Sequence, residues 1–153
     1  MAQSVTIRDL TFEVGQYYRR KSIHDRLGGS RQSGICPLRQ FAAILLFTGE
    51  TGEQHGYGYD GWAAEGLFHY TGEGQRGDML WLRGNRAVRD HIDNEKQLLL
   101  FGKPPRGRAN PGEVIFMGEM ECVNTITYDR DSEGTDRTTF VFVFKPVDAA
   151  APQ

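Results

Sequence analysis

Cysteine is scarce in this chain. Of its 153 residues only Cys36 and Cys122 are cysteines, and they lie far apart. Two distant thiols form neither a zinc-site spacing nor a disulfide framework, so we expect free thiols in a reducing cytoplasm. The apolar run that ends at Phe47 is far shorter than the roughly 20 residues that span a membrane. The opening residues lack a basic region followed by an apolar block, so no secretory signal is expected.

Motifs of metal and nucleotide chemistry are also missing. The histidines are scattered, with no H-x-x-H or H-E-x-x-H spacing and no HNH nuclease pattern. The glycine-rich segment Gly28–Gly34 lacks the Gly-Lys-Ser/Thr ending of a P-loop, and no helical pattern follows it. Linear spacing indicates no pair of nucleophile and base. We therefore predict no catalytic residue, no metal and no small-molecule cofactor, which describes a binding module and not an enzyme.

Net charge is small too, at −2, and this total does not by itself indicate a nucleic-acid binder. The distribution of charge is uneven. Residues 15–39 carry six lysines and arginines against one acid, whereas residues 112–136 carry seven acids against one arginine. The pattern predicts one anion-facing side, away from the acidic segment, with an ordinary solvated surface as the alternative.

Strand-forming sequence is what the chain does contain. The continuous apolar run at residues 42–47 and the largely apolar residues 97–101 and 138–144 predict strands, and residues 4–14 and 114–123 predict further extended segments. Residues 85–96 have helical composition, and Asn85 is placed to cap that helix. We expect one domain over residues 1–146, followed by an alanine-rich tail or linker start at residues 147–153.

The most informative stretch runs from His55 to Arg89. Closely spaced tyrosines supply stacking faces for a flat ring, and Asp60 can accept a hydrogen bond from an exocyclic amine such as cytosine N4. The apolar residues 66–70 predict a strand, and the glycine-bounded residues 71–75 predict a tight turn. Aromatic pairs in β proteins also serve as core or cross-strand contacts, which is the alternative interpretation.

On these residues the chain resembles a known family. The ordered set Tyr59-Asp60, Phe68-His69-Tyr70-Thr71-Gly72-Glu73-Gly74 and Gly84-Asn85-Arg86-Ala87 is similar to the core of the SRA (YDG) domain. That family binds modified cytosine in DNA by flipping the base out of the duplex. The nearest type is the SRA-like domain attached to HNH nucleases in bacterial modification-dependent restriction enzymes. The resemblance implies a mainly β (α+β) fold, a curved SRA-like β-barrel with one or two flanking helices.

The resemblance also implies three groups of site residues. The modified-base pocket would comprise Tyr59, Asp60, Tyr70, Thr71 and Gly72. A loop that approaches the DNA groove and fills the gap left by the flipped base would comprise Arg26, Gly28, Gly29, Ser30, Arg31, Gln32 and Ser33. Phosphate contacts would come from Arg19, Arg20, His24, Arg83, Asn85, Arg86 and Arg89. The usual family spacing from Tyr70 places the first tyrosine at Gly58, so Tyr57 is an alternative to Tyr59.

The implied partner is double-stranded DNA that carries 5-methyl- or 5-hydroxymethylcytosine, read for a nuclease domain present in cis or in trans. No membrane partner is expected, and the expected location is the cytoplasm. Two alternatives come from other classes of function. One is an RNA-binding or protein-interaction β-barrel, and the other is a catalyst that acts on modified DNA.

Overall fold

The computed structural model describes residues 4–49, 60–74, 76–104 and 112–147, and among these residues strands are far more common than helices. The two helices are α1 (Arg20–Leu27) and α2 (Arg83–Arg89), and one 3-10 turn, η1, covers Ala64–Gly66. The strands are β1 (Ser4–Ile7), β2 (Leu10–Glu13), β3 (Tyr17–Arg19), β4 (Ile35–Pro37), β5 (Ala43–Phe47), β6 (Gly61–Trp62), β7 (Phe68–Thr71), β8 (Gln97–Gly102), β9 (Glu113–Arg130) and β10 (Asp136–Pro146). This mainly β composition with two helices confirms the predicted fold class.

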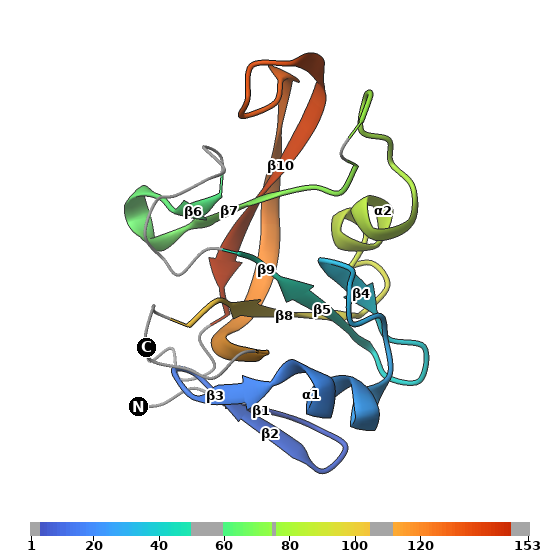
Figure 1. The fold of residues 1–153 in the computed structure, drawn as a ribbon, viewed down its shortest axis with the longest axis vertical. Coiled ribbons are helices and arrows are strands. Elements are labelled where there is room, and N and C mark those ends of the chain that lie inside the picture. Colours follow the sequence, from blue (N-terminus) through green and yellow to red (C-terminus); the bar gives the residue numbers. More distant parts are fainter. Residues whose placement is uncertain (1–3, 50–59, 75, 105–111, 148–153) are drawn as a thin grey trace.

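The strands form two sheets (Figure 1). β1 and β2 pair as a small hairpin, and the large sheet runs in the order β4-β5-β8-β9-β10-β7-β6, with β3 paired to β9 beside this path. Helix α1 packs beside β3, and α2 packs beside β4. The distal end of the β9–β10 hairpin stands at the top of Figure 1, next to the turn that follows β7.

β5 and β8 pair in parallel at the centre of the large sheet. In β5 the side chains of Ala43, Leu45 and Phe47 belong to one buried cluster, with β1, β2 and α1, while Ile44 and Leu46 belong to a second. The second cluster contains residues of β7, β10 and α2, and β8 alternates between the clusters in the same way. Because successive strand residues point to opposite faces, a strand covered on both faces is apolar at every position. The strands predicted at residues 42–47 and 97–101 are confirmed.

β9 is the longest strand and joins the two halves of the large sheet. Its first part pairs with β3 and β8, and its second part pairs with β10. The β8–β9 register shifts between Leu100 and Phe101, where the facing strand carries Gly118 with φ 123°. Residues other than glycine rarely adopt this φ, and such a bulge bends a strand. The bend allows β9 to pair with β3 and β8 in one half of the sheet and with β10 in the other.

The helices differ from the prediction. We expected one helix over residues 85–96 with Asn85 as its cap, but α2 spans Arg83–Arg89 and its N-cap is Leu82. Helix α1 was not predicted because its apolar stripe consists only of Ile23 and Leu27, which is too sparse to recognise. Neither of these helices, the two found in the described ranges, is long and apolar enough to cross a membrane.

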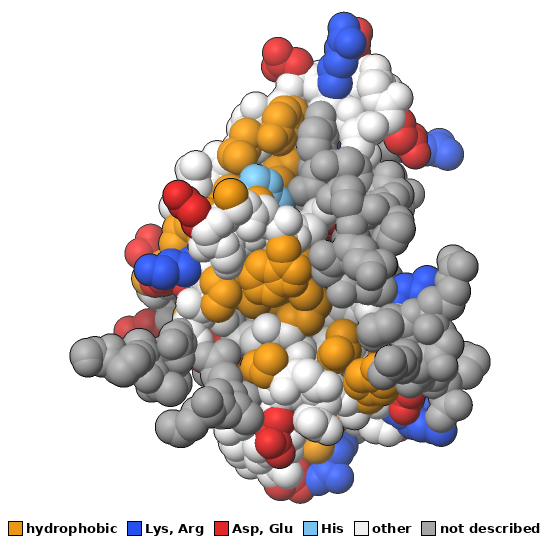
Figure 2. Space-filling view, turned by 90° about the vertical axis from the view of Figure 1, so that its left-hand side faces the viewer, with side chains coloured by type: hydrophobic (Ala, Val, Ile, Leu, Met, Phe, Trp, Pro, Cys, Tyr) orange, Lys and Arg blue, Asp and Glu red, His pale blue; other side chains and the backbone are white. Residues whose placement is uncertain are grey.

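One broad face, seen from the left of Figure 1, carries hydrophobic side chains over much of its middle (Figure 2). The charged side chains visible on this face lie near its edges, and both signs occur there. The predicted basic side of the molecule is therefore not this face. The exposed cations that could form such a side belong to the loops and helices considered below.

Candidate functional site

A cavity of about 550 Å³ opens where β7, the turn after β7 and the end of the β9–β10 hairpin meet. Four of the five predicted pocket residues line it, namely Asp60, Tyr70, Thr71 and Gly72. Antiparallel pairing with β10 aligns Tyr70 with Phe142 and Thr71 with Val141, which fixes the two β7 residues at the cavity. Tyr59 and its alternative Tyr57 lie outside the residues that the structure describes.

Asp60 is a buried acceptor on the cavity wall. It is 8% exposed, and its carboxylate accepts hydrogen bonds from the Thr71 backbone N–H at 2.8 Å, from the Thr71 hydroxyl and from the Thr48 hydroxyl at 3.4 Å. Burial raises the pKa of Asp60 above its ordinary value, and the hydrogen bonds from Thr71 and Thr48 oppose this rise. A carboxylate held in this way can accept a further hydrogen bond from a donor that enters the cavity.

Tyr70 combines a cavity-facing position with structural contacts. Its side chain is 4% exposed, and its hydroxyl lies 3.0 Å from both the Gly34 and the Phe47 carbonyl oxygens. Burial raises the pKa of Tyr70, so the hydroxyl stays protonated and donates. The ring lies 5.6 Å from that of Phe144. Tyr70 therefore joins β7 to β5 and to the end of the loop that follows α1.

That loop, residues 28–34, is fixed at its base. The Arg20 guanidinium donates to the Ser30 and Ser33 carbonyl oxygens at 3.1 and 2.6 Å, and the Cys36 sulfur lies 3.1 and 3.2 Å from the same two oxygens, to either of which its thiol can donate. Ser30 also accepts hydrogen bonds through its hydroxyl from the backbone N–H groups of Gln32 and Ser33. Arg31 and Gln32 at the tip remain exposed. The loop thus presents two polar side chains on a firm base.

The same contacts engage two of the side chains that were predicted to bind phosphates, Arg20 and His24. Arg20 lies 3.7 Å above the centre of the Phe47 ring, and its Nε donates to His24 Nε2 at 3.0 Å. The His24 ring is 7% exposed and its Nδ1 lies 2.8 Å from the Gly28 carbonyl oxygen, so Nδ1 carries the proton and the ring is neutral. Burial lowers the pKa of His24, which keeps it uncharged. Both side chains support the loop, His24 from a buried position and Arg20 from a partly exposed one.

Asn85 is a third predicted phosphate contact whose side chain is engaged within the protein. It is 1% exposed and accepts a hydrogen bond from the Glu73 N–H at 2.8 Å while donating to the Glu73 and Leu80 carbonyl oxygens at 2.9 and 3.1 Å. Gly72 leaves the space for it, because a Cβ there would lie 2.7 Å from Asn85 Oδ1. Asn85 therefore shapes the turn beside the cavity from within and has no free group for a phosphate.

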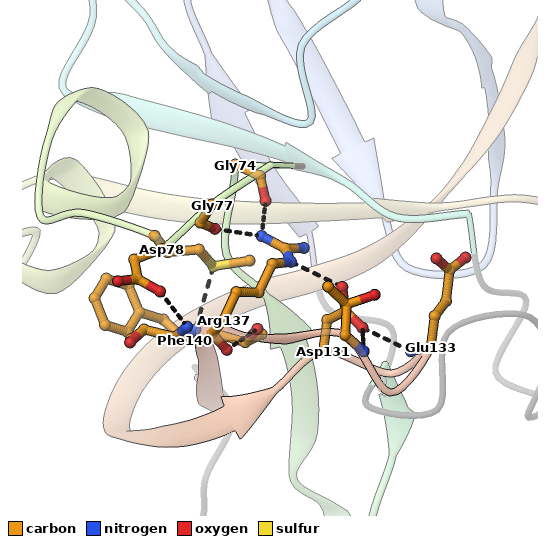
Figure 3. Close-up of polar contacts among 11 residues, drawn as sticks. Gly74, Gly77, Asp78, Asp131, Glu133, Arg137 and Phe140 are labelled. Atoms are coloured by element: carbon orange, nitrogen blue, oxygen red, sulfur yellow. Dashed lines mark hydrogen bonds and ion pairs between the residues drawn. The ribbon is translucent and has the colours of Figure 1, made fainter.

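The end of the β9–β10 hairpin is the part of the site that sequence reasoning missed. We expected the acidic segment to lie away from the site, but Asp131, Ser132 and Glu133 line the cavity together with Arg137. Arg137 reaches across to the turn after β7 and donates to the Gly74 and Gly77 carbonyl oxygens at 2.8 and 3.0 Å (Figure 3). No local motif marks these residues, because only the β7–β10 pairing brings the hairpin to the cavity.

The remaining arginines predicted to contact DNA differ in exposure and in their ion pairs. Arg19, Arg31, Arg83 and Arg86 are exposed. Arg26 pairs with Asp9, and Arg89 pairs with Asp90 at 2.8 Å and lies 5.1 Å from the Trp81 ring centre. A groove of about 730 Å³ lies next to the cavity, shares Glu73, Gly74 and Met79 with it, and reaches both Ser33 and Arg83. It thereby connects the cavity to the loop after α1 and to the start of α2.

The arrangement can hold a flat polar ring. Asp60 and Thr71 offer hydrogen-bonding groups, Tyr70 offers an aromatic surface, and exposed arginines stand on neighbouring elements. Among the residues that the structure describes, no group of three or more His, Cys, Asp or Glu side chains is arranged to hold a metal ion.

Comparison with known proteins gives a consistent picture. The family model for the ScoMcrA-like SRA domain matches residues 14–153. No protein of curated function matches the chain. Among solved structures, the type IV phosphorothioation-dependent restriction endonuclease ScoMcrA superposes with a TM-score of 0.69 at 23% identity over 94% of this chain. This chain spans 29% of the ScoMcrA chain.

Two further structures share the fold. The DNA recognition domain of the cytosine modification-dependent restriction endonuclease LpnPI superposes with a TM-score of 0.69 at 16% identity, over 90% of this chain and 74% of that one. The SUVH5 SRA domain, bound to fully hydroxymethylated CG DNA, superposes with a TM-score of 0.62 at 14% identity, over 93% of both chains.

Proposed function

Because this chain belongs to the ScoMcrA-like SRA domain family, we propose that it is a DNA-reading module that binds a modified cytosine flipped out of the duplex. The observation that carries the proposal is the cavity that gathers Asp60, Tyr70, Thr71 and Gly72 on one wall. In the proposed complex Tyr70 contacts the face of the flipped ring. Asp60 accepts a hydrogen bond from the cytosine amino group, since its carboxylate is fixed and buried.

The energetics require more than the pocket. Flipping a base costs a few kcal/mol, and stacking on an aromatic side chain returns about 1–3 kcal/mol per base. The exposed tip residues Arg31 and Gln32 are therefore proposed to occupy the vacated position in the stack. Arg19, Arg83 and Arg86, all exposed, and Arg89 are proposed to contact phosphates. The salt-dependent phosphate contacts would hold the duplex while the base enters the cavity.

The module is proposed to serve a restriction system that attacks modified DNA. The similarity to part of ScoMcrA and to the recognition domain of LpnPI supports this role. In this proposal the cutting is done by a nuclease domain, in cis or in trans, and 5-methyl- or 5-hydroxymethylcytosine is the mark that is read.

A binding panel tests the proposal. Duplexes with one 5-methylcytosine, one 5-hydroxymethylcytosine or no modification, and an RNA of the same sequence, would be compared at one salt concentration. We expect tighter binding to a modified duplex than to the plain duplex or the RNA, and a rise in 2-aminopurine fluorescence when that base replaces the neighbour of the mark. Equal affinity for all duplexes would refute the proposal, and preference for RNA would favour an RNA-binding barrel.

A further inference from the structure

Two segments far apart in the sequence form the outer walls of the cavity. One is the turn between β7 and α2, represented by Gly74 and Met79, and the other is the end of the β9–β10 hairpin, represented by Asp131 and Glu133. They are joined by a bridge, defined here as Arg137 together with Asp131 and the carbonyls of Gly74 and Gly77 (Figure 3). The hairpin supplies the guanidinium, and the turn supplies two of its three acceptors.

The bridge differs from an ordinary surface ion pair. The side chains of Arg137 and Asp131 are 11% and 14% exposed, whereas Arg130 and Asp136 in the same hairpin form a pair that is 69% and 84% exposed. Exposed pairs contribute little to stability. The planar guanidinium of Arg137 instead directs Nε to Asp131 and Nη1 to the turn, so one rigid group sets the position of both walls.

The two carboxylate oxygens of Asp131 accept hydrogen bonds from different groups. Oδ1 accepts hydrogen bonds from the Glu133 and Thr135 N–H groups at 3.0 and 2.9 Å, which shapes the hairpin loop. Oδ2 accepts from Arg137 Nε at 2.8 Å. The hydrogen bond from Arg137 is the main reason why the pKa of Asp131 lies below its ordinary value. The shape of the loop and its attachment to the turn therefore depend on one carboxylate.

Further contacts beside the bridge tie the same two segments together. The Thr138 N–H donates to Asp78 at 2.7 Å, the Met79 N–H donates to the Thr138 carbonyl oxygen at 2.9 Å, and the Phe140 N–H lies 3.2 Å from the Met79 sulfur (Figure 3). These contacts hold the inner part of the turn against β10. The bridge is the contact that extends this attachment outward to Gly74 and to Asp131 at the cavity mouth.

We infer that Arg137 is a positioning residue that sets the width of the cavity mouth and thereby the discrimination between a modified and a plain base. The inference rests on the proposed function. The exposed arginines proposed to contact phosphates, Arg19, Arg83 and Arg86, are on other elements, so the bridge acts on base recognition and leaves backbone binding unchanged. Losing the bridge releases the hairpin loop from the turn and shortens the lifetime of the complex with a modified duplex.

Matched substitutions in one hairpin test this inference. Arg137→Gln and Arg130→Gln remove the same charge from the same hairpin, but only the first breaks the bridge. Affinities would be measured for a duplex with one 5-methylcytosine and for the plain duplex. We expect Arg137→Gln to lower the modified-to-plain affinity ratio about tenfold through faster dissociation, with plain-duplex affinity within about twofold of the parent. Arg130→Gln should leave the ratio unchanged.

A second variant separates positioning from folding. Asp131→Asn keeps an Oδ1 acceptor for Glu133 and Thr135 but loses the carboxylate oxygen that binds Arg137, so the loop can form without its attachment. It should lower the ratio as Arg137→Gln does. Amide hydrogen exchange should increase at residues 76–79 and 131–135 and stay unchanged in β8, whereas a global loss of stability would raise exchange in all of these segments.

Each remaining outcome decides the question. In one outcome the parent protein prefers the modified duplex, while Arg137→Gln and Asp131→Asn keep the same modified-to-plain affinity ratio as the parent. That result would overturn the inference and leave the proposed function standing. Equal losses on both duplexes would also overturn it, because Arg137 would then be a phosphate contact. A parent that binds both duplexes equally would refute the proposed function and this inference with it.

Discussion

At the scale of single residues, Tyr70 shows how one side chain serves both the fold and the site. Its hydroxyl lies between two carbonyl oxygens, from Gly34 and Phe47, while its ring belongs to the buried cluster that includes Leu46 and Phe142. The expected role in base recognition thus comes from a side chain that the fold already holds in one orientation. Substitutions must therefore separate the hydroxyl from the ring.

Tyr70→Phe makes that separation. The ring is retained, while the Phe47 carbonyl oxygen loses a donor in a buried place, which costs about 1–3 kcal/mol. We expect the free energy of unfolding to fall by about this amount in urea denaturation. Because the ring face remains, the preference for modified DNA should persist. Loss of that preference in a folded Tyr70→Phe variant would mean that the hydroxyl reads the base.

Asp60 gives a prediction about pH. Burial raises its pKa in the folded chain, so between the folded and the unfolded pKa the folded chain holds a proton that the unfolded chain has released. The contribution of Asp60 to the free energy of unfolding therefore grows as pH falls through the raised pKa. It levels off below the ordinary unfolded value of about 3.9. Asp60→Asn removes this contribution.

The measurement is the difference in melting temperature between the parent and Asp60→Asn, taken from neutral pH to about pH 4. We expect the difference to move in favour of the parent as the pH falls. A difference that does not change with pH would show that the carboxyl has the same pKa in the folded and the unfolded chain. Comparing the two proteins cancels the titration of all other groups.

At the scale of elements, the loop after α1 is a rigid support with a small polar tip. Arg20, His24 and Cys36 hold its backbone, so deleting the loop would also remove the hydrogen-bond partners of these three side chains. Replacing only the tip residues Arg31 and Gln32 with alanine leaves this support intact. The tip can therefore be tested without unfolding the base of the loop.

We expect the Arg31→Ala, Gln32→Ala double variant to bind a modified duplex about tenfold more weakly, because nothing then occupies the gap left by the flipped base. Binding to a modified single strand, which has no stack to hold open, should change much less. Competition binding with the two substrates measures this. Equal losses on both would identify the tip as a phosphate contact only.

Helix α2 separates two arginines that the sequence treats alike. The Arg86 side chain is 68% exposed, and its Nε lies 4.0 Å from Asp90, whereas Arg89 is engaged by Asp90 and Trp81. Arg86→Ala should weaken modified and plain duplexes equally and reduce the slope of affinity against salt by about one ion. Titration at several salt concentrations measures the slope, with Lys145→Ala in β10 as the control. A loss confined to modified DNA would place Arg86 in base recognition.

At the scale of the whole molecule, the central strands divide the interior in two. Leu45 and Leu46 are neighbours in β5 and are both fully buried, yet they belong to different clusters. The cluster of Leu46 contains Tyr70 and Ile35, which line the cavity, whereas the cluster of Leu45 reaches the cavity through Phe47 and otherwise includes residues of α1 and of the β1–β2 hairpin. The ring proposed to contact the base, that of Tyr70, thus belongs to the cluster of Leu46 and not to that of Leu45.

Leu45→Ala and Leu46→Ala test this division. Each should lower the free energy of unfolding by about 2–5 kcal/mol, because each leaves a cavity of similar size. Only Leu46→Ala should also reduce the preference for a modified duplex, since it loosens the packing behind Tyr70. Urea denaturation measures the free energy of unfolding of both variants. Binding to modified and plain duplexes is then compared under conditions in which both variants are folded. The same preference in both variants would contradict the division.

The sequence alone determined the elements that are specified locally. The apolar runs of β5, β8 and β10 are continuous because these strands are covered on both faces, and that pattern is visible without a structure. The family resemblance implied a pocket of five residues, and four of them, Asp60, Tyr70, Thr71 and Gly72, line one cavity. The fifth, Tyr59, lies outside the described residues.

Only the tertiary structure decided which groups face the cavity and which face inward. Pairing between β7 and β10 joins segments that are about seventy positions apart, and it brings Asp131 and Arg137 to a site whose motif lies at residues 60–74. His24 and Asn85 are buried, and the guanidinium of the partly exposed Arg20 is bound to the loop after α1, although residues of these types also occur as exposed phosphate contacts. Charge and periodicity are local properties of a chain, whereas burial and proximity depend on contacts between distant segments.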